Sequence, residues 1–504
     1  MKKNTVKFAK AIADGGFRRR LKDRHVQLIA LGGIIGSGYF LVTGEVIHLV
    51  GPSVFIAYLL GGLIILLTMH CMGELAVAIP VSGSFVSYSS DLISPAFACG
   101  VGWSYWISWI FYIPAECIAG GIILQMLTGI NGYIWSLGIG LMVTYINLAK
   151  VDNFGEIEFW LALIKISALI GFVIVSIFIF FGIIHGPQPP GIIGFKYLLH
   201  EGGLLPNGAM ALMTAMVLLL VNYQGSEIIG LAAGESENPA RMIPHAVRNV
   251  TYRILFIYIL PVLCLVTIYP WQKAGLSNSV FAEALNFYGL KWAGFATSMI
   301  TLSASISCAN SGFYGTVRVL NALARDGMAY SPFAKLNHNA MPQNAIIGTI
   351  TAVWIILGFS YFIGQSKLYV ALLLVSGFTG TLSWIALCWA QINFRRQLYK
   401  AGYTISDLRY VTPYSPYTGI LGIVLMLFAM CFLFFNTDPL YKIAFAIGLL
   451  FFIIPVLWYK IIPRKESDIT RVGFKDVFPD RSGVNTDYSA GTDLDPINPG
   501  RYSV

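Results

Sequence analysis

Long apolar runs alternate with short polar segments along almost the whole chain, from Val26 to Ile462. An apolar run of about 20 residues can cross the hydrocarbon core of a bilayer as a helix. The pattern predicts twelve such spans, and therefore an all-α polytopic membrane protein. The predicted spans are 26–50, 53–78, 97–127, 132–148, 158–184, 207–233, 253–269, 292–323, 345–363, 368–391, 417–435 and 440–462.

Two of these spans contain a polar, glycine-bearing interruption. The first lies at Gly32–Gly38 in span 1, and the second lies at Asn222–Glu227 in span 6. At membrane depth, backbone groups released from a helix are tolerated only where they line a cavity or bind something. Interruptions at corresponding positions in two halves of a hydrophobic protein indicate the substrate site of a secondary transporter.

The positions of the interruptions, and position alone, predict two repeats of five spans followed by two further helices. Beyond the last span the composition shifts to Asp, Ser, Gly, Pro and Asn, which favours a mostly disordered tail. The expected boundaries are 1–25 for a basic N-terminal tail, 26–462 for the transporter domain, 26–184 and 207–391 for its repeats, 417–462 for helices 11 and 12, and 463–504 for the C-terminal tail.

The composition narrows the functional classes. Of the 504 residues, 56% are hydrophobic and 11% are charged, and the mean hydropathy is +0.70, which excludes a soluble multi-domain enzyme. The seven cysteines show no Cys-x-x-Cys pairing, so we interpret them as small buried hydrophobes. The chain has no Gly-x-x-x-x-Gly-Lys-[Ser/Thr] loop, so transport is expected to run on a gradient rather than on ATP.

The basic residues behind the net charge of +9 lie in the loops and tails between the predicted spans. This pattern indicates the membrane topology rather than a surface for nucleic acid. If both termini are cytoplasmic, the inner segments hold 27 of the 33 Lys and Arg residues, as the positive-inside rule requires. Residues 1–24 are charged and polar without an apolar core, so a cleaved signal peptide is not expected. The predicted location is the cytoplasmic (inner) membrane, with both termini cytoplasmic.

The first interruption contains a candidate binding site for a carboxylate. Gly36, Ser37 and Gly38 can expose successive N–H groups at the start of a half-helix, where the positive end of the helix dipole favours an anion. The alternative is that these glycines only allow close packing of helices.

Four charged residues in or near the spans are further candidates. Glu227 could bind a cationic group or carry a proton, since a carboxylate at membrane depth is costly, or it could cap the second half-helix. Glu116 is balanced between a functional and a structural role, and Glu74 is interpreted as structural or as part of an inner gate. Lys165 could take the place of a coupling cation and titrate, or it could snorkel to the cytoplasmic face.

Several motifs together resemble the amino acid permease family of the amino acid-polyamine-organocation superfamily, and most closely its bacterial lysine-specific permeases. They occur in the family's order from Leu21 to about Arg396. The matching segments are Gly33–Gly38, Gly73–Ala76, Pro80–Phe85, Gly102–Trp106, Gln224–Glu227, Ala233–Pro239 and Asn310–Gly312, with Tyr314, Arg318, Asp326 and Gly327. One departure is Asn222-Tyr223, where the family usually has Ser-Phe or similar.

The resemblance implies a LeuT-like fold: a 5 + 5 inverted repeat plus two C-terminal helices, with discontinuous helices 1 and 6 and alternating access. It also implies that the substrate carboxylate meets the first interruption, and that Lys165 replaces a sodium ion of other relatives. The substrate-binding residues expected are Ile34, Gly36, Ser37, Gly38, Glu116, Tyr223, Gly225, Ser226 and Glu227. Proton coupling is expected at Lys165, Glu227 and Glu116, and gating or structural roles are expected at Glu74 and Asn310.

The predicted function is uptake of lysine or another basic amino acid together with a proton. The alternatives are a permease for neutral or aromatic amino acids, an amino acid exchanger, and a membrane amino acid sensor. An enzyme is least expected, because neither a nucleophile–base pair nor a metal-ligand cluster is visible. The expected partners are the amino acid, the proton and membrane lipid, without a cofactor, metal ion, nucleotide or nucleic acid.

Overall fold

The computed structural model describes residues 35–81, 83–148, 154–186, 192–199, 203–233, 239–275, 279–337, 341–461 and 473–481. Within these residues all regular elements are helices. The predicted tail 1–25, the candidate Ile34 and most of 463–504 lie outside them.

Twelve of the helices have more than twelve residues. They are α3 (Ser37–Val50), α4 (Val54–Ala78), α6 (Pro95–Thr128), α7 (Gly132–Leu148), α8 (Phe154–Phe180), α10 (Gly208–Leu220), α12 (Pro239–Arg253), α15 (Lys291–Arg325), α16 (Gln343–Ile363), α17 (Gln365–Lys400), α18 (Tyr417–Phe435) and α19 (Pro439–Ile461). The shorter α-helices are α5 (Ser84–Leu92), α9 (Lys196–Leu199), α11 (Ile228–Ala233), α13 (Leu260–Ile268), α14 (Val280–Phe287) and α20 (Phe474–Val477).

Local sequence signals set the ends of these helices. Pro95 opens α6 at a position where no intrahelical N–H bond is lost, and Ser94 Oγ accepts the Phe97 N–H. At the other end of α6, Gly129 takes a left-handed φ of 73° and closes the helix. Between α3 and α4, Gly51 has a φ of 72°, and the turn that follows it contains Pro52.

Nine of the described helical segments are long and apolar enough to cross a membrane. One of them, Ser37–Ala78, contains both α3 and α4, which a short turn separates. The apolar helix α7 has 17 residues and is shorter than these segments, and the 35-residue α15 is not among them. The predicted all-helical membrane class is confirmed, whereas the count of twelve spans stays a prediction.

Predicted and observed boundaries agree best where the helix ends at the edge of an apolar run. The predicted spans 132–148 and 417–435 coincide with α7 and α18. The span predicted at 253–269 is too short, because the helical segment begins at Pro239 and contains a π-helical stretch at Ile254–Ile259. Hydropathy marks the part of a helix that contacts lipid, and it does not detect helical turns that continue into water.

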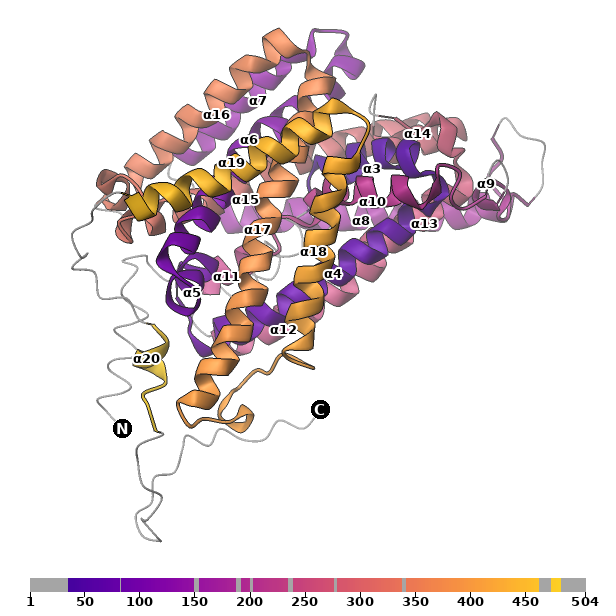
Figure 1. Cartoon of the computed structure of the whole chain (residues 1–504). Helices are drawn as coiled ribbons and strands as arrows, with labels where there is room; N and C mark the ends of the chain where they lie inside the picture. The colour runs from indigo at the N-terminus through magenta and orange to yellow at the C-terminus, as the bar shows by residue number, and fades with distance from the viewer. Residues whose placement is uncertain are drawn as a thin grey trace.

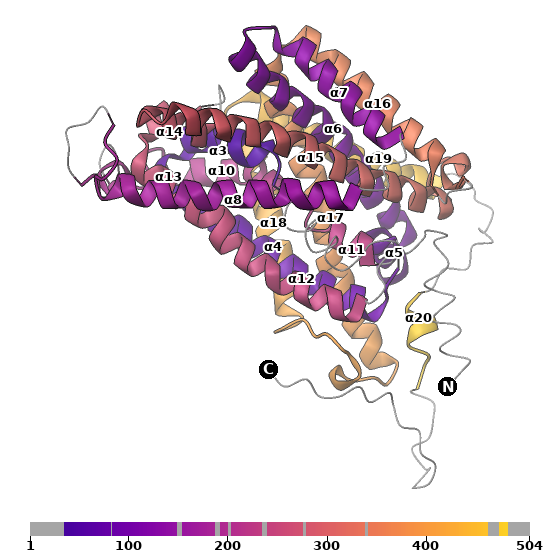
Figure 2. The ribbon, with the colours of Figure 1, turned by 180° about the vertical axis from the view of Figure 1, so that it is seen from behind.

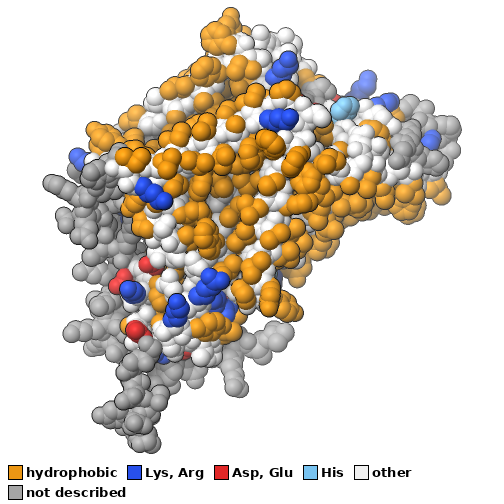
Figure 3. All heavy atoms as spheres, viewed as in Figure 1, with side chains coloured by type: hydrophobic (Ala, Val, Ile, Leu, Met, Phe, Trp, Pro, Cys, Tyr) orange, Lys and Arg blue, Asp and Glu red, His pale blue; other side chains and the backbone are white. Residues whose placement is uncertain are grey.

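Helices α6 and α17 form the centre of the bundle. Helix α6 packs against α15, α17, α7 and α19. In the apolar 18-residue stretches of α6 and α17, 78% and 83% are buried inside the bundle. The corresponding shares are 17% for α19 and 28% for α8 and α16, which lie on the outside (Figures 1 and 2). Figure 3 shows the outer face over α17, α18 and α19 as a broad apolar surface, with Lys and Arg gathered mainly at its edges. Such a surface fits a lipid environment.

A short C-terminal segment packs against the lower end of α17 (Figure 1). Phe474 and Phe478 lie edge-on to the Phe394 ring, each with centroids 5.7 Å apart. The Phe474 N–H donates to Asp91 of α5 at 2.6 Å, and the Arg481 N–H donates to the Ala401 carbonyl at 3.0 Å. Residues 473–481 are thus an ordered part of a tail that was expected to be mostly disordered, because aromatic burial and these backbone hydrogen bonds hold them.

Candidate functional site: two helix interruptions

The second predicted interruption lies between α10 and α11. A short 3-10 turn, Val221–Tyr223, follows α10, Gln224 is extended, and α11 begins only at Ile228. Gly225 has a φ of 96°, a backbone conformation that only glycine adopts without strain. The Gln224 side chain links this interruption to α17. Its Nε2 donates to the Ser376 carbonyl at 2.8 Å, and its Oε1 accepts from Ser376 Oγ at 2.9 Å.

Glu227 ties this interruption to two neighbouring helices. Its Oε1 accepts the Tyr105 hydroxyl of α6 at 3.0 Å, and its Oε2 accepts the Trp384 indole N–H of α17 at 3.0 Å. The Gly225 N–H adds a third donor, at 3.1 Å from Oε1. Ser226 next to it donates to the Tyr223 carbonyl and accepts from Arg253 Nη2. Both carboxylate oxygens of Glu227 are thus already hydrogen-bonded.

The first interruption is described from Ile35 onward, where Gly36 is extended and α3 begins at Ser37. No side chain of α3 caps this helix start. Instead Glu116 of α6 supplies the cap, since its Oε2 accepts the Ser37 N–H at 3.1 Å. A carboxylate at a helix N-terminus is favourable because it satisfies a free N–H and complements the dipole. A Cβ on Gly36 would collide with Glu116 Oε1 and would lie 2.8 Å from Cys308 Sγ, so any other residue at this position would displace these two side chains.

Lys165 of α8 reaches the same interruption. It is fully buried, and its Nζ donates to the Ile35 carbonyl at 3.2 Å and to Ser307 Oγ of α15 at 2.8 Å. Its ammonium group is therefore directed into the bundle and joins α8, α15 and the extended backbone before α3. The alternative of snorkelling to a membrane surface is wrong, because burial and both hydrogen bonds hold the ammonium inside.

Four buried polar atoms from three helices and the second interruption make no hydrogen bond of standard length and angle within the described residues. They are Ser37 Oγ, Glu116 Oε1, Asn222 Oδ1 and Tyr369 Oη. The Tyr369 hydroxyl approaches the Ser37 hydroxyl, and Glu116 is approached by Ser37, Tyr112 and Cys308. Three of the four groups therefore lie together beside the first interruption. A buried polar group without a partner costs about 1–3 kcal/mol. Four of them around two interruptions suit a ligand that supplies both donors and acceptors.

Two of these four residues were not selected as candidates from the sequence. Asn222 opens the second interruption and departs from the family pattern, which was a usable signal. Tyr369 lies in an apolar run like many other tyrosines of the chain, and only the three-dimensional arrangement singles it out.

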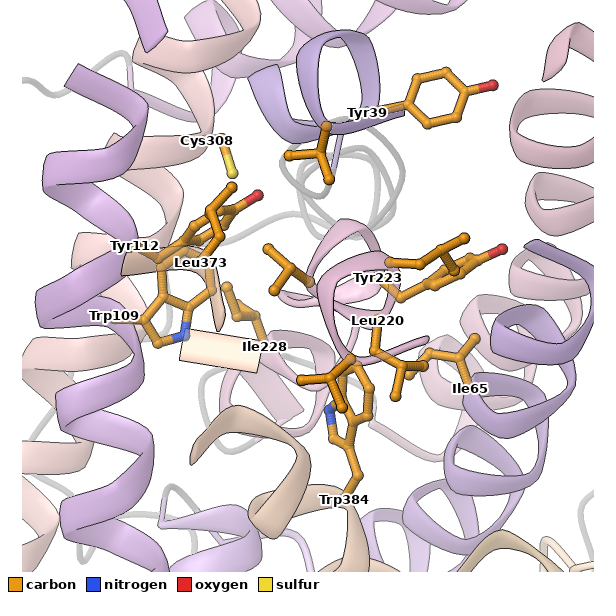
Figure 4. Close-up of a cluster of buried hydrophobic side chains, with 14 of the residues drawn as sticks. Tyr39, Ile65, Trp109, Tyr112, Leu220, Tyr223, Ile228, Cys308, Leu373 and Trp384 are labelled. Carbon is orange, nitrogen blue, oxygen red and sulfur yellow. The ribbon is translucent and has the colours of Figure 1, made fainter. Parts of the chain in front are cut away.

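Tyr223 turns away from this group of atoms. Its hydroxyl donates to the Tyr58 carbonyl at 2.7 Å, and its ring lies 4.7 Å from that of Tyr258. In Figure 4 the side chains of Tyr39 and Tyr223 extend to one side, while Tyr112 and Cys308 lie together on the other. Its predicted role as a substrate-binding residue stays a prediction, and the observed contacts are with α4 and the π-helical stretch.

Glu74 and Asn310 lie in separate hydrogen-bonded groups. Asn310 Oδ1 of α15 accepts from Asn147 Nδ2 of α7 at 2.8 Å. Glu74 of α4 pairs with Arg395 of α17 through two hydrogen bonds, of 2.5 and 2.6 Å, and accepts the Thr412 N–H at 2.5 Å. The Glu74–Arg395 pair links α4 to α17, and the Thr412 hydrogen bond fastens the loop that follows α17 onto α4.

The same loop contributes a second link to α4. The Tyr410 hydroxyl lies 2.7 Å from His70 Nδ1. Burial, together with the nearby Glu74 carboxylate, raises the pKa of the Tyr410 phenol, so it keeps its proton at neutral pH. These links support the predicted structural reading of Glu74, while a gating role stays a prediction.

The described residues form a bundle of apolar helices with two interruptions, and a buried lysine and unsatisfied polar groups lie beside these interruptions. This is the architecture of a membrane transporter. The match to a known family agrees with this class. The chain belongs to the amino acid permease family, whose model matches residues 25–470. Members of this family are transporters, and the protein is accordingly not an enzyme.

Among its relatives, the amino-acid permease RocE of Bacillus subtilis is 35% identical over 459 residues, which cover 90% of this chain and 97% of the relative. The lysine-specific permease LysP of Escherichia coli is 36% identical over 425 residues, which cover 82% of this chain and 86% of the relative. A manganese transporter of Eremococcus coleocola shares the fold, with a TM-score of 0.53 at 14% identity over 87% of this chain and 94% of that one.

Proposed function

We propose that this permease takes up a basic amino acid, such as lysine, together with a proton, by alternating access. The observation that carries the proposal is Glu116 Oε1, a buried carboxylate oxygen beside the start of α3 that makes no hydrogen bond of standard length and angle within the described residues. A negative charge in a low-dielectric interior favours a cationic group strongly. The relatives named lysine-specific permeases support the same substrate class.

Lys165 is the residue proposed to couple transport to the proton. Its ammonium binds the carbonyl of Ile35, the residue that precedes the extended Gly36. Loss of its proton would remove the charge that attracts this carbonyl dipole, and the interruption could then move relative to α8 and α15. Glu116 and Glu227 remain further candidates for carrying the proton.

The proposed arrangement is the one implied by the family: twelve helices in a 5 + 5 inverted repeat plus two, with discontinuous helices 1 and 6. Both termini are proposed to be cytoplasmic, in the cytoplasmic membrane. With this orientation an inside-negative potential adds about 2.3 kcal/mol per 100 mV to the uptake of one positive charge.

Uptake of radiolabelled lysine into proteoliposomes tests the proposal, with a pH gradient and a membrane potential imposed separately. Uptake should rise with an inward proton gradient in the unaltered protein. Lys165→Ala should abolish this rise, while Lys442→Ala, a matched change on the exposed surface of α19, should leave it intact.

The rival functions give different results in the same experiment. Entry of a neutral amino acid without entry of lysine would overturn the basic substrate. Lysine uptake that needs an internal amino acid but no proton gradient would indicate an exchanger, and binding without any flux would indicate a sensor.

A further inference from the structure

Hydrogen bonds with two tyrosines hold Asn222 in place within the second interruption. It is almost completely buried, and its backbone carbonyl accepts the Tyr258 hydroxyl at 2.9 Å. Its side-chain Nδ2 donates to the Tyr58 hydroxyl oxygen at 2.7 Å. Both the backbone and one end of the amide are therefore fixed.

The orientation of the Asn222 amide follows from the number of protons available along one chain of hydrogen bonds. Thr43 Oγ1 lies 2.5 Å from the Tyr39 carbonyl, which can only accept, so the single hydroxyl proton of Thr43 is used there. Thr43 Oγ1 also lies 2.5 Å from the Tyr58 hydroxyl, and must therefore accept the proton of Tyr58. We call this chain, from the Tyr39 carbonyl through Thr43 and Tyr58 to Asn222, the hydroxyl relay.

The hydroxyl relay leaves the Tyr58 oxygen with no proton to donate to Asn222. Only the Nδ2 side of the amide can face it, since the opposite orientation would bring two acceptors together. The acceptor Oδ1 is consequently turned away from Tyr58, and it has no partner among the described residues.

Gly38 shows where this oxygen points. A Cβ built on Gly38 would lie 2.6 Å from Asn222 Oδ1 and 3.4 Å from the Tyr112 hydroxyl. Asn222 Oδ1 and the Tyr112 hydroxyl therefore both lie beside the first turn of α3, and the lack of a side chain at Gly38 allows the close approach of Asn222. The Tyr112 phenol also interacts electrostatically with Glu116 and Cys308. Asn222 Oδ1 therefore lies against the start of α3, the same helix start that Glu116 caps.

We propose that Asn222 Oδ1 is a specificity-determining acceptor, which receives a hydrogen bond from a nitrogen donor in the substrate's side chain. The proposal rests on the amino acid uptake proposed above and adds a residue that selects among substrates. An apolar side chain of equal size leaves this buried oxygen unpaired, and sites built to hydrogen-bond a substrate reject analogues that lack the group.

The test compares pairs of amino acids that differ mainly in a nitrogen donor. Lysine against norleucine and glutamine against methionine are suitable pairs, measured by competition and by direct uptake in proteoliposomes. In the unaltered protein at least one nitrogen-bearing member should be preferred at least tenfold. Asn222→Leu, which keeps the size and removes the acceptor, should reduce this preference at least tenfold. Asn222→Asp, which keeps an acceptor, should preserve or increase the preference for lysine.

Tyr58→Phe tests the hydroxyl relay without changing an atom of Asn222. Without the Tyr58 oxygen, nothing prevents the amide from turning, so the preference should fall by an intermediate amount. This variant also decides the matter if Asn222→Leu yields no folded protein. An unchanged preference in Tyr58→Phe and in every folded Asn222 variant would overturn the inference.

The outcome is separable from that of the proposed function. If lysine does not enter but glutamine is preferred over methionine and Asn222→Leu removes this preference, the basic substrate fails and the inference stands. If the unaltered protein takes up amino acids but prefers neither nitrogen-bearing member, the inference is overturned and amino acid transport stands.

Discussion

The two helix interruptions use the same residue type in opposite ways. At the second interruption both oxygens of Glu227 are hydrogen-bonded, by Tyr105, Trp384 and Gly225. At the first interruption Glu116 caps Ser37 with one oxygen, and its other oxygen makes no hydrogen bond of standard length and angle, although Tyr112 and Cys308 lie near the carboxyl group. Both carboxylates are buried in the same bundle. The difference teaches that an acid at membrane depth is not a binding group by burial alone, because its remaining capacity for hydrogen bonds decides what it can do.

Glu116→Gln should have the largest effect on transport. The substitution keeps the shape and removes the negative charge, and truncating one side of a buried charge contact costs about 2–5 kcal/mol. The Michaelis constant for a basic amino acid should therefore rise at least tenfold, measured by uptake in proteoliposomes, while thermal stability changes little.

The matched control for this change is Glu45→Gln on α3, a half-buried glutamate that is not among the atoms without partners. An equal rise in the Michaelis constant in Glu45→Gln, or none in Glu116→Gln, would contradict the assignment of the cation-binding role to Glu116.

Glu227→Gln should act in the opposite manner. The glutamine side chain has one acceptor oxygen, whereas the donors around Glu227 use two. At least one donor therefore loses its partner, at a cost of about 1–3 kcal/mol. The melting temperature in detergent should fall, and the substrate affinity of the remaining folded protein should stay the same. A normal melting temperature combined with loss of proton-driven uptake would instead favour the predicted role of Glu227 in proton coupling.

Two phenol deletions should show the smallest effects and sharpen the contrast. Tyr105→Phe removes a donor to Glu227 and should lower the free energy of unfolding by about 1 kcal/mol. Tyr369→Phe removes a buried hydroxyl that approaches Ser37 but makes no hydrogen bond of standard length and angle, so stability should fall by less than in Tyr105→Phe. Melting curves of both variants, recorded side by side, check this. Equal destabilisation by both changes would mean that Tyr369 has a structural partner.

The interruptions could be predicted from the sequence because their residues are unusual locally. Glycine and polar residues inside an apolar run cannot be explained by lipid contact, and Lys165 stands out for the same reason. Which carboxylate has a free oxygen could not be predicted. The donors that occupy Glu227 lie 122 and 157 residues away along the chain, on α6 and α17. Their approach is set by helix packing, which hydrophobic periodicity does not specify.

The amide of Asn222 illustrates the same limit at the level of single atoms. Its orientation depends on a proton count that begins at the Tyr39 carbonyl and passes through Thr43 and Tyr58. None of these three residues is exceptional in an apolar sequence. Only their arrangement on α3 and α4 determines which end of the amide remains without a hydrogen-bond partner.

The docked segment at residues 473–481 sets a practical limit on how far the chain can be shortened. Its two phenylalanines cover Phe394, and Phe478 also lies 5.2 Å from the Tyr403 ring. A chain cut directly after α19 would expose these aromatic rings to water, and exposed aromatic patches promote aggregation. Fusion tags and protease sites should therefore be placed after Arg481, so that residues 473–481 continue to cover these rings during purification.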